Sequence, residues 1–311
     1  MPLSILEAKY PTPLISVVMN GYNSEKYLRE AIDSVLNQTW TNWEIVFWDN
    51  CSEDRTLDIV ESYQDSRIHF YCAPCLMPLS TGRNEAIQRC EGEWIAFLDC
   101  DDIWLSEKLE KQINLLEGSS KNNIGLIYAR TLSFSESGDE GEAIYKYHNR
   151  SLPSGNIFQA LLSEGNLVPI VSALVSKQAV NRVGAIPEIY TFAEDYWLFV
   201  SIAAHYEVLC VQEICCRYRV HSGSATFKNK LKSHQEALAI VQLWQESIEP
   251  KKYNKRCAEY HTLIGIERIR LKGMRVRGFR EIIEKGSLLF LMRGAITTLY
   301  RYWFKRQRPY S

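Results

Sequence analysis

The stretch Ile95-Ala96-Phe97-Leu98-Asp99-Cys100-Asp101-Asp102 joins four apolar residues directly to three carboxylates. A short apolar run bounded in this way is typical of a buried strand. In an open parallel sheet, ligands bind at the carboxyl ends of strands, which is where these carboxylates stand. A divalent cation, Mg²⁺ or Mn²⁺, suits carboxylate oxygens and would relieve their mutual repulsion. The alternative for this segment alone is a solvated acidic turn that caps the next helix.

Around this stretch, the first 130 residues alternate short apolar runs with segments of helical spacing. We expect strands at 14–19, 44–48, 67–71, 94–98 and 125–129, and helices at 25–38, 54–64, 80–90 and 106–116. This alternation predicts an α/β fold with a mostly parallel sheet flanked by helices. Further along we expect helices at 156–163 and 193–204, an extended run at 170–175, strands at 208–212 and 215–220, and helices from 231 onward, broken at Pro250.

The composition fits a large globular domain with an appendage. With 46% hydrophobic and 23% charged residues, the 311-residue chain matches neither a disordered nor a fibrous protein. The nine cysteines are scattered and odd in number, which favours free thiols in a reducing cytosol over disulfides or a zinc site. No signal peptide is visible and no apolar run reaches the ~20 residues that span a bilayer, so we expect a cytoplasmic protein.

The charge is divided unevenly along the chain. Residues 251–311 hold 16 Lys/Arg and 4 Asp/Glu, whereas residues 1–250 hold 20 and 33. The net charge of −1 therefore combines an acidic body with a basic C-terminal region. No recognition motif accompanies the basic charge, so we do not expect nucleic acid as a partner.

A basic amphipathic helix is expected over 288–303. Its apolar stripe consists of Leu288, Met292, Ala295, Ile296, Leu299 and Trp303. Such a helix can lie on an anionic membrane surface, which would make the protein peripheral on the inner face of the membrane. Packing on the catalytic body or on a second subunit is the alternative.

Polar residues follow three of the expected strands. The first strand leads into Asn20-Gly21-Tyr22-Asn23, the second into Asp49, and the fourth into Asp99 and Asp101. Each set alone could be turn chemistry, but three sets on one edge of one sheet would line a crevice suited to a nucleotide. No Walker A motif and no GxGxxG is present, so a metal held by carboxylates would have to neutralise the phosphates.

The order of four motifs resembles glycosyltransferase family 2. They are ISVVMNGYNSEKYLREAIDSVLNQT (15–39), WEIVFWDNCSEDRT (43–56), STGRNEAI (80–87) and GEWIAFLDCDDIW (92–104). The resemblance covers about 14–221. It implies a GT-A fold, the Rossmann-like fold of nucleotide-diphospho-sugar transferases, over residues 1–225, followed by a basic helical region over 226–311.

The resemblance also implies roles for individual residues on the donor side. Asp49 matches the acidic residue that contacts the nucleoside base or ribose, and Arg83 matches a basic residue that contacts the nucleotide. Asp99 and Asp101 match the DxD motif, which holds the ribose and the metal–diphosphate. Asn20, Tyr22 and Asn23 stand in the first nucleotide-sugar-binding loop.

On the acceptor side, Glu194 and Asp195 resemble a pair at the head of a helix, with Asp195 as the general base and Glu194 orienting it. His221 matches a histidine beside the donor phosphates or the metal, which makes Asp101, Asp99 and His221 the expected metal ligands. Asn50 and Cys51 depart from the family, which often has Asp and Gly there, and leave room for an altered choice of nucleotide.

The expected reaction is a metal-dependent, inverting transfer of a sugar from a nucleotide-diphosphate donor to the hydroxyl of a glycan or lipid-linked acceptor, in cell-surface polysaccharide or glycolipid biosynthesis. Two alternatives stay open. A sugar nucleotidyltransferase also uses carboxylate-held metals, but it usually needs a Gly-rich basic loop that residues 14–30 do not offer. A non-catalytic nucleotide-sugar-binding or membrane-scaffold protein is the other alternative, against which Asp99, Asp101 and Asp195 argue.

Overall fold

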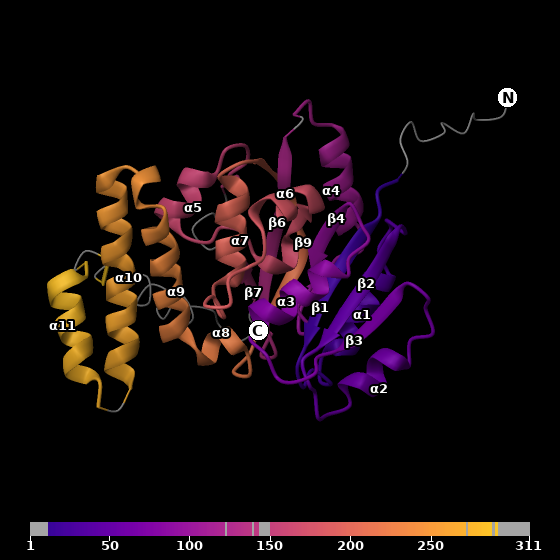
Figure 1. The fold of residues 1–311 in the computed structure, drawn as a ribbon, viewed down its shortest axis with the longest axis horizontal. Coiled ribbons are helices and arrows are strands. Elements are labelled where there is room, and N and C mark those ends of the chain that lie inside the picture. Colours follow the sequence, from indigo (N-terminus) through magenta and orange to yellow (C-terminus); the bar gives the residue numbers. More distant parts are fainter. Residues whose placement is uncertain are drawn as a thin grey trace, which may run out of the picture. The chain divides into compact units, whose positions relative to one another are not determined.

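The computed structural model of the chain describes residues 12–121, 123–138, 140–142, 150–271, 273–287 and 290–291 (Figure 1). The chain divides into two compact units. The first comprises Met1–Phe158 and Asn166–Ser222, and the second comprises Gln159–Gly165 and Gly223–Ser311.

The first unit is built on one mixed sheet with the strand order β3-β2-β1-β4-β8-β6-β9-β5, and β7 pairs with β6. The strands are β1 (Ile15–Gly21), β2 (Trp43–Asp49), β3 (Ile68–Cys72), β4 (Trp94–Phe97), β5 (Ile103–Trp104), β6 (Ile124–Ser135), β7 (Glu140–Glu142), β8 (Leu174–Ser176) and β9 (Glu207–Val220). The strands β3, β2, β1 and β4 are parallel neighbours, as are β6 and β9. The strand β8 joins these two parts through antiparallel pairs. The α/β fold predicted from the sequence is therefore confirmed.

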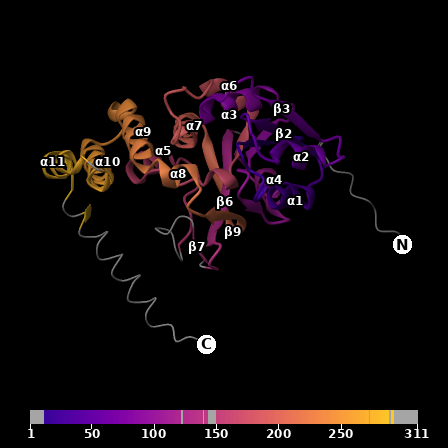
Figure 2. The same cartoon turned by 90° about the horizontal axis from the view of Figure 1, so that it is seen from below.

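Helices cover both faces of this sheet. They are α1 (Leu28–Leu36), α2 (Thr56–Glu61), α3 (Leu79–Gln88), α4 (Lys108–Glu117), α6 (Lys177–Val183) and α7 (Glu194–Ala203). Figure 2 shows α3 and α6 on one face and α1 and α4 on the other. The parallel strands are buried on both faces, so they are apolar throughout rather than alternating. Ile15, Val17 and Met19 of β1 pack in the same core cluster as Leu28 and Ile32 of α1.

Three predicted elements differ from the structure. The two strands expected at 208–212 and 215–220 are one strand, β9, whose polar Gln212 and Glu213 stand at a register irregularity opposite β6 rather than in a turn. The run at 170–175 begins as a 3₁₀-helix, Ile170–Ser172, before β8. The helix expected at 80–90 is α3, which begins one residue earlier, at Leu79, because Pro78 already holds the extended conformation of its N-cap.

The second unit is helical among the residues that the structure describes. Its helices are α5 (Phe158–Glu164), α8 (Ala225–Lys228), α9 (Lys230–Leu243), α10 (Pro250–Arg270) and α11 (Arg275–Lys285). The helices α10 and α11 approach closely, since a Cβ added to Gly278 would lie 2.5 Å from the carbonyl oxygen of Gly265. Pro250 begins α10 at a position that needs no N–H donor.

No helix in these described ranges is long and apolar enough to cross a bilayer. The helix expected over 288–303 lies outside the described residues, apart from residues 290–291.

Candidate active site

The loop after β4 separates its three carboxylates into two environments. The side chains of Asp99 and Asp101 keep 35% and 31% of their surface exposed. Asp102 is buried, and its Oδ1 accepts a hydrogen bond of 2.8 Å from the backbone N–H of Arg219. Burial, with Asp101 and Asp99 close by, raises the pKa of Asp102 well above its usual value. Asp102 therefore supports the loop, and Asp99 and Asp101 are left to meet a ligand.

A buried arginine joins α3, the β4 loop and α7. The guanidinium of Arg83 donates to Glu194 Oε1 over 2.6 Å and to Asp99 Oδ1 over 3.0 Å. Burial lowers the pKa of Arg83, but Glu194, Asp99 and Asp195 outweigh it and keep the pKa above its ordinary value. The side chain is therefore a fixed cation, with its Nε buried and without a partner among the described residues.

The two acidic residues at the start of α7 differ in their surroundings. Glu194 is buried against Arg83, whereas Asp195 is half-buried. Asp195 Oδ2 accepts from Asn166 Nδ2 over 2.9 Å, and its Oδ1 accepts from the backbone N–H of Tyr196 over 2.6 Å. Burial raises the pKa of Asp195 to about 6, although the Arg83 guanidinium opposes this shift. A half-buried carboxylate held by two donors, with a pKa near neutrality, suits a general base.

His221 stands directly after β9 and reaches the β4 loop. Its Nε2 lies 2.8 Å from Asp101 Oδ2, and its ring packs edge-on against Tyr27, with centroids 5.3 Å apart. Asp101 and His221 therefore offer an oxygen and a nitrogen atom at one place, although they are separated by 120 residues in the sequence.

Arg219 links the end of β9 to the β4 loop and to α1. Besides its backbone bond to Asp102, its Nε donates to the backbone carbonyl of Asp101 over 2.8 Å and its guanidinium donates to Glu30 over 2.9 Å. The guanidinium also lies 4.2 Å from the centroid of the Tyr27 ring. Sequence reasoning missed Arg219 and Asn166. The available signal for Arg219 was its place near the end of the strand that leads to the predicted ligand His221.

The carboxyl ends of β1 and β2 present polar atoms that the protein itself does not satisfy. Asp49 Oδ2 accepts from the backbone N–H of Ser52, but the buried Oδ1 has no partner in the described parts of the chain. Both polar atoms of the Asn20 side chain are also buried without a partner among the described residues. The same holds for the indole N–H of Trp48, the residue of β2 that pairs in register with Asn20. Because buried polar atoms without partners cost free energy, this edge suits a polar ligand.

The other two residues expected in the first loop lie differently. Tyr22 is largely exposed. Asn23 holds the left-handed backbone conformation, with φ of 49°, and its side-chain oxygen accepts from the backbone N–H of Glu53. The backbone N–H of Asn23 donates to the Ser52 hydroxyl, so Asn23 ties the loop after β1 to the loop after β2.

A divalent cation at the β4 loop would find two protein ligands and would need more. In the described ranges, no group of three His, Cys, Asp or Glu side chains could hold a metal ion by itself. Asp101 and His221 are adjacent and partly exposed, whereas Asp99 is already paired with Arg83. One or two carboxylates completed by substrate phosphates are a usual arrangement for Mg²⁺, so Asp101 and His221 fit an ion that a diphosphate helps to bind.

The family model of Glycosyl transferase family 2 matches residues 16–172, half of the chain. The chain belongs to glycosyl transferase family 2. It is therefore an enzyme of the glycosyltransferase class, which rules out the nucleotidyltransferase and non-catalytic alternatives.

A curated relative supports this family membership. The chain is 31% identical over 221 residues to the Escherichia coli protein named UDP-Glc:alpha-D-GlcNAc-diphosphoundecaprenol beta-1,3-glucosyltransferase WfgD, an alignment that covers 70% of this chain and 81% of WfgD.

Solved structures share the fold at low sequence identity. TarS from S. aureus in complex with UDP-GlcNAc superposes with a TM-score of 0.65 at 18% identity, over 88% of this chain and 81% of that chain. The mannosyltransferase PcManGT from Pyrobaculum calidifontis, in complex with GDP-Man and Mn²⁺, superposes with a TM-score of 0.61 at 16% identity, over 97% of this chain and 86% of that chain.

Proposed function

We propose that this family 2 glycosyltransferase moves a sugar from a nucleotide-diphosphate donor to an acceptor hydroxyl with inversion at the anomeric carbon, and that residues 1–225 form its catalytic domain. The observation that carries the proposal is the convergence of four chain segments. The carboxyl ends of β1 and β2 bring unpartnered polar atoms, the β4 loop brings Asp99 and Asp101, and α7 brings Asp195 beside a fixed arginine. In a sheet of this kind, nucleotides bind at this edge.

The nucleoside has a place among the unpartnered atoms of the β1 and β2 ends. The Oδ1 of Asp49 can accept a hydrogen bond from a base N–H or a ribose hydroxyl, and the carboxamide of Asn20 can donate or accept one. A Cβ at Gly82 would lie 3.2 Å from the Trp48 ring and 3.5 Å from Asn20 Nδ2, so α3 closes this edge and fixes these side chains.

The diphosphate of the donor, which leaves with the negative charge, has a place at the β4 loop. Negative charge builds on the leaving diphosphate as the sugar bond breaks. The cation of Arg83, held by Glu194 and Asp99, is preorganised close to the loop and would favour that charge without moving. A divalent cation bound by Asp101 and His221 would supply Lewis-acid stabilisation to the same phosphates when present. PcManGT, which shares the fold, is a complex with GDP-Man and Mn²⁺.

The acceptor hydroxyl needs a group that removes its proton. Asp195 is the candidate, because its carboxylate is accessible and is oriented by Asn166. The oxygen of the acceptor forms the new bond to the anomeric carbon, the bond to the donor phosphate oxygen breaks, and Asp195 takes the proton. One displacement with no enzyme nucleophile inverts the anomeric centre.

The acceptor class rests on the relative. The name of WfgD gives UDP-Glc as its donor and a lipid-linked GlcNAc diphosphate as its acceptor. By analogy we assign this chain a nucleotide-sugar donor and a glycan or lipid-linked acceptor in cell-surface polysaccharide biosynthesis.

A donor panel with one variant tests this proposal. The panel consists of UDP- and GDP-linked sugars, each with and without Mn²⁺. At least one of them should raise the Tm of the protein, because a ligand that binds the native state stabilises it. Asp101→Ala should remove the Mn²⁺-dependent part of the donor affinity, because the variant lacks one of two adjacent metal ligands. Isothermal calorimetry with and without Mn²⁺ measures this difference.

The exposed Asp58→Asn is the matched control, since Asp58 lies on α2 and bears only a weak ion pair with Arg55. If Asp101→Ala kept the same Mn²⁺-dependent affinity, its role as a ligand would be wrong. If no nucleotide sugar in the panel shifted the Tm, the donor class itself would be wrong.

A further inference from the structure

The outer face of α11 carries an apolar stripe that nothing among the described residues covers. Val276, Phe279 and Ile283 are 79%, 56% and 81% exposed. Their spacing of three and four residues places them on one face of the helix. The opposite face packs on α10 through Gly278 and Ile282. We call Val276, Phe279 and Ile283 the apolar stripe.

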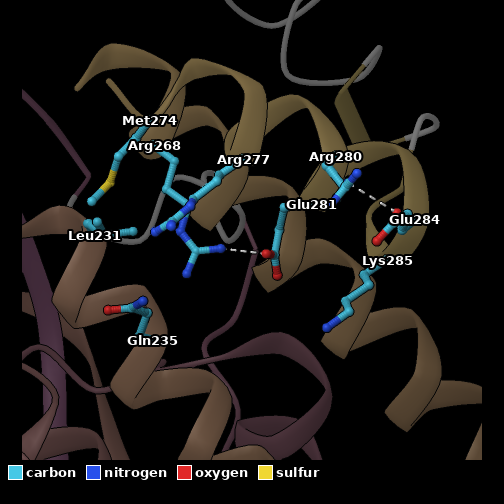
Figure 3. Close-up of a pocket in the computed structure, with 9 residues that line it drawn as sticks. All are labelled: Leu231, Gln235, Arg268, Met274, Arg277, Arg280, Glu281, Glu284 and Lys285. Atoms are coloured by element: carbon cyan, nitrogen blue, oxygen red, sulfur yellow. Dashed lines mark hydrogen bonds and ion pairs between the residues drawn. The ribbon is translucent and has the colours of Figure 1, made fainter. Parts of the chain in front are cut away.

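A basic pocket lies between α9, α10 and α11, on the face of α11 that is turned away from this stripe. Its cavity of about 510 Å³ is lined by Arg268, Arg277, Arg280 and Lys285 together with Glu281 and Glu284 (Figure 3). Glu281 is engaged by Arg268, and Glu284 by Arg280, as the dashed lines in Figure 3 mark. Neither Arg277 nor Lys285 has a carboxylate within ion-pair distance in the part of the chain that the structure describes. The pocket therefore has uncompensated positive charge.

Two arginines border the apolar stripe, one on each side. Along α11, Arg275 falls on one side of the stripe and Arg280 falls on the other. Both are exposed. A helix with a bulky apolar face between basic flanks is the arrangement that binds at the interface of an anionic bilayer. Long arginine side chains can remain at the level of the phosphates while the apolar residues enter the acyl boundary.

We propose that α11 docks the second unit on an anionic phospholipid surface, with the apolar stripe in the interfacial region and Arg275 and Arg280 at the level of the lipid phosphates. The charge argues for lipid rather than a second copy of this chain. A two-fold contact through the stripe would place the same basic flanks of both copies against each other. The inference goes beyond the transfer reaction and does not depend on it.

Flotation of the full-length protein with vesicles tests the surface. The protein should float with vesicles that contain phosphatidylglycerol and should stay behind with phosphatidylcholine alone. In a stripe variant, Phe279→Ser and Ile283→Ser are combined. In a flank variant, Arg275→Gln and Arg280→Gln are combined. Because each basic residue near an anionic surface strengthens partitioning about fivefold, the flank variant should lose about 25-fold. The stripe variant should lose about tenfold or more, since two large apolar side chains no longer enter the interface.

Two variants of the same unit are the matched controls. Leu243→Ser removes a 61% exposed apolar side chain from the end of α9. Lys251→Gln with Lys252→Gln removes two exposed charges from the start of α10, so the net charge equals that of the flank variant. Both controls should float as the unchanged protein does, and all variants should keep its Tm and its activity on a water-soluble acceptor.

Several outcomes would overturn the proposal. It fails if the unchanged protein does not float with anionic vesicles, or if the stripe variant floats equally well. It fails if the flank variant and the Lys251/Lys252 control lose the same amount, because total charge rather than the arginines beside the stripe would then explain binding. It also fails if light scattering shows a dimer that the stripe variant converts to a monomer while flotation is unchanged.

Discussion

Asp195→Asn is expected to lower kcat about 100- to 10,000-fold, the range that loss of a general base costs. The substitution keeps the size of the side chain, and the new amide oxygen can still accept the hydrogen bond from the Tyr196 N–H, so the fold should persist. The affinity for the donor should stay the same, because Asp195 is assigned to the acceptor. Single-turnover transfer and a calorimetric donor titration measure the two quantities separately.

The pH profile of the unchanged enzyme gives an independent readout of the same residue. Burial raises the pKa of Asp195 to about 6, and Glu194, Arg83 and Asp99 are the charged groups that surround it. The carboxylate that accepts the proton therefore accumulates as the pH rises through about 6. We expect kcat to rise with pH below this value and to level off above it. A nearly normal turnover rate in Asp195→Asn would remove Asp195 as the base.

Arg83→Met should be the most destabilising single substitution in the site. It leaves Glu194 and Asp99 next to each other without the cation that lies 2.6 Å and 3.0 Å from them. Breaking a buried ion pair by removal of one partner costs about 3–5 kcal/mol of the free energy of unfolding. Urea unfolding at neutral pH measures this loss. We expect donor binding to weaken as well, since the fixed cation near the diphosphate site is gone.

The pH dependence separates this charge effect from a simple packing defect. Burial raises the pKa of Glu194 in the folded protein to about 8, although Arg83 opposes that rise. Without Arg83 the folded-state pKa rises further, so the part of the stability cost that is due to Glu194 grows as the pH rises through about 8 and vanishes at low pH, where Glu194 is protonated in both proteins. Arg55→Met is the matched control. Arg55 is 75% exposed and 3.9 Å from Asp58, so its loss should change stability by no more than about 0.5 kcal/mol. Equal losses in both variants would contradict the buried-network interpretation.

The residues of the proposed donor side could be grouped from the sequence, because their placement depends on a local rule. In parallel strands, every carboxyl end reaches the same edge of the sheet, so the residues that end β1, β2 and β4 had to be neighbours. Asn20, Asp49 and Asp99 could therefore be grouped without knowledge of any contact. The strand-like runs and the helical spacing also revealed the α/β fold, although the ends of several elements moved by one to three residues and the strand expected at 125–129 continues six residues further, to Ser135.

The contacts across the sheet could not be predicted in this way. The bond from Arg219 to Asp102 joins residues 117 positions apart, and no pattern along the chain specifies a partner at that distance. Asn166, which orients Asp195, precedes the 3₁₀-helix in a segment without regular structure. The irregularity in β9 could not be predicted either, because polar residues such as Gln212 and Glu213 are also typical of a turn between two strands.

The family match ends before the last strand of the first unit, and this limits what the match says about the enzyme. The match ends at residue 172, whereas α7 begins at Glu194 and β9 begins at Glu207. The recognisable part of the chain therefore stops before Asp195, Arg219 and His221. A shortened version designed on the matched region would still be assigned to the family, yet it would lack the proposed base and the arginine that fastens the carboxylate loop. A survey that compares relatives over that region alone would group the enzymes by the residues proposed to bind the donor. It would not compare the residues proposed to act on the acceptor.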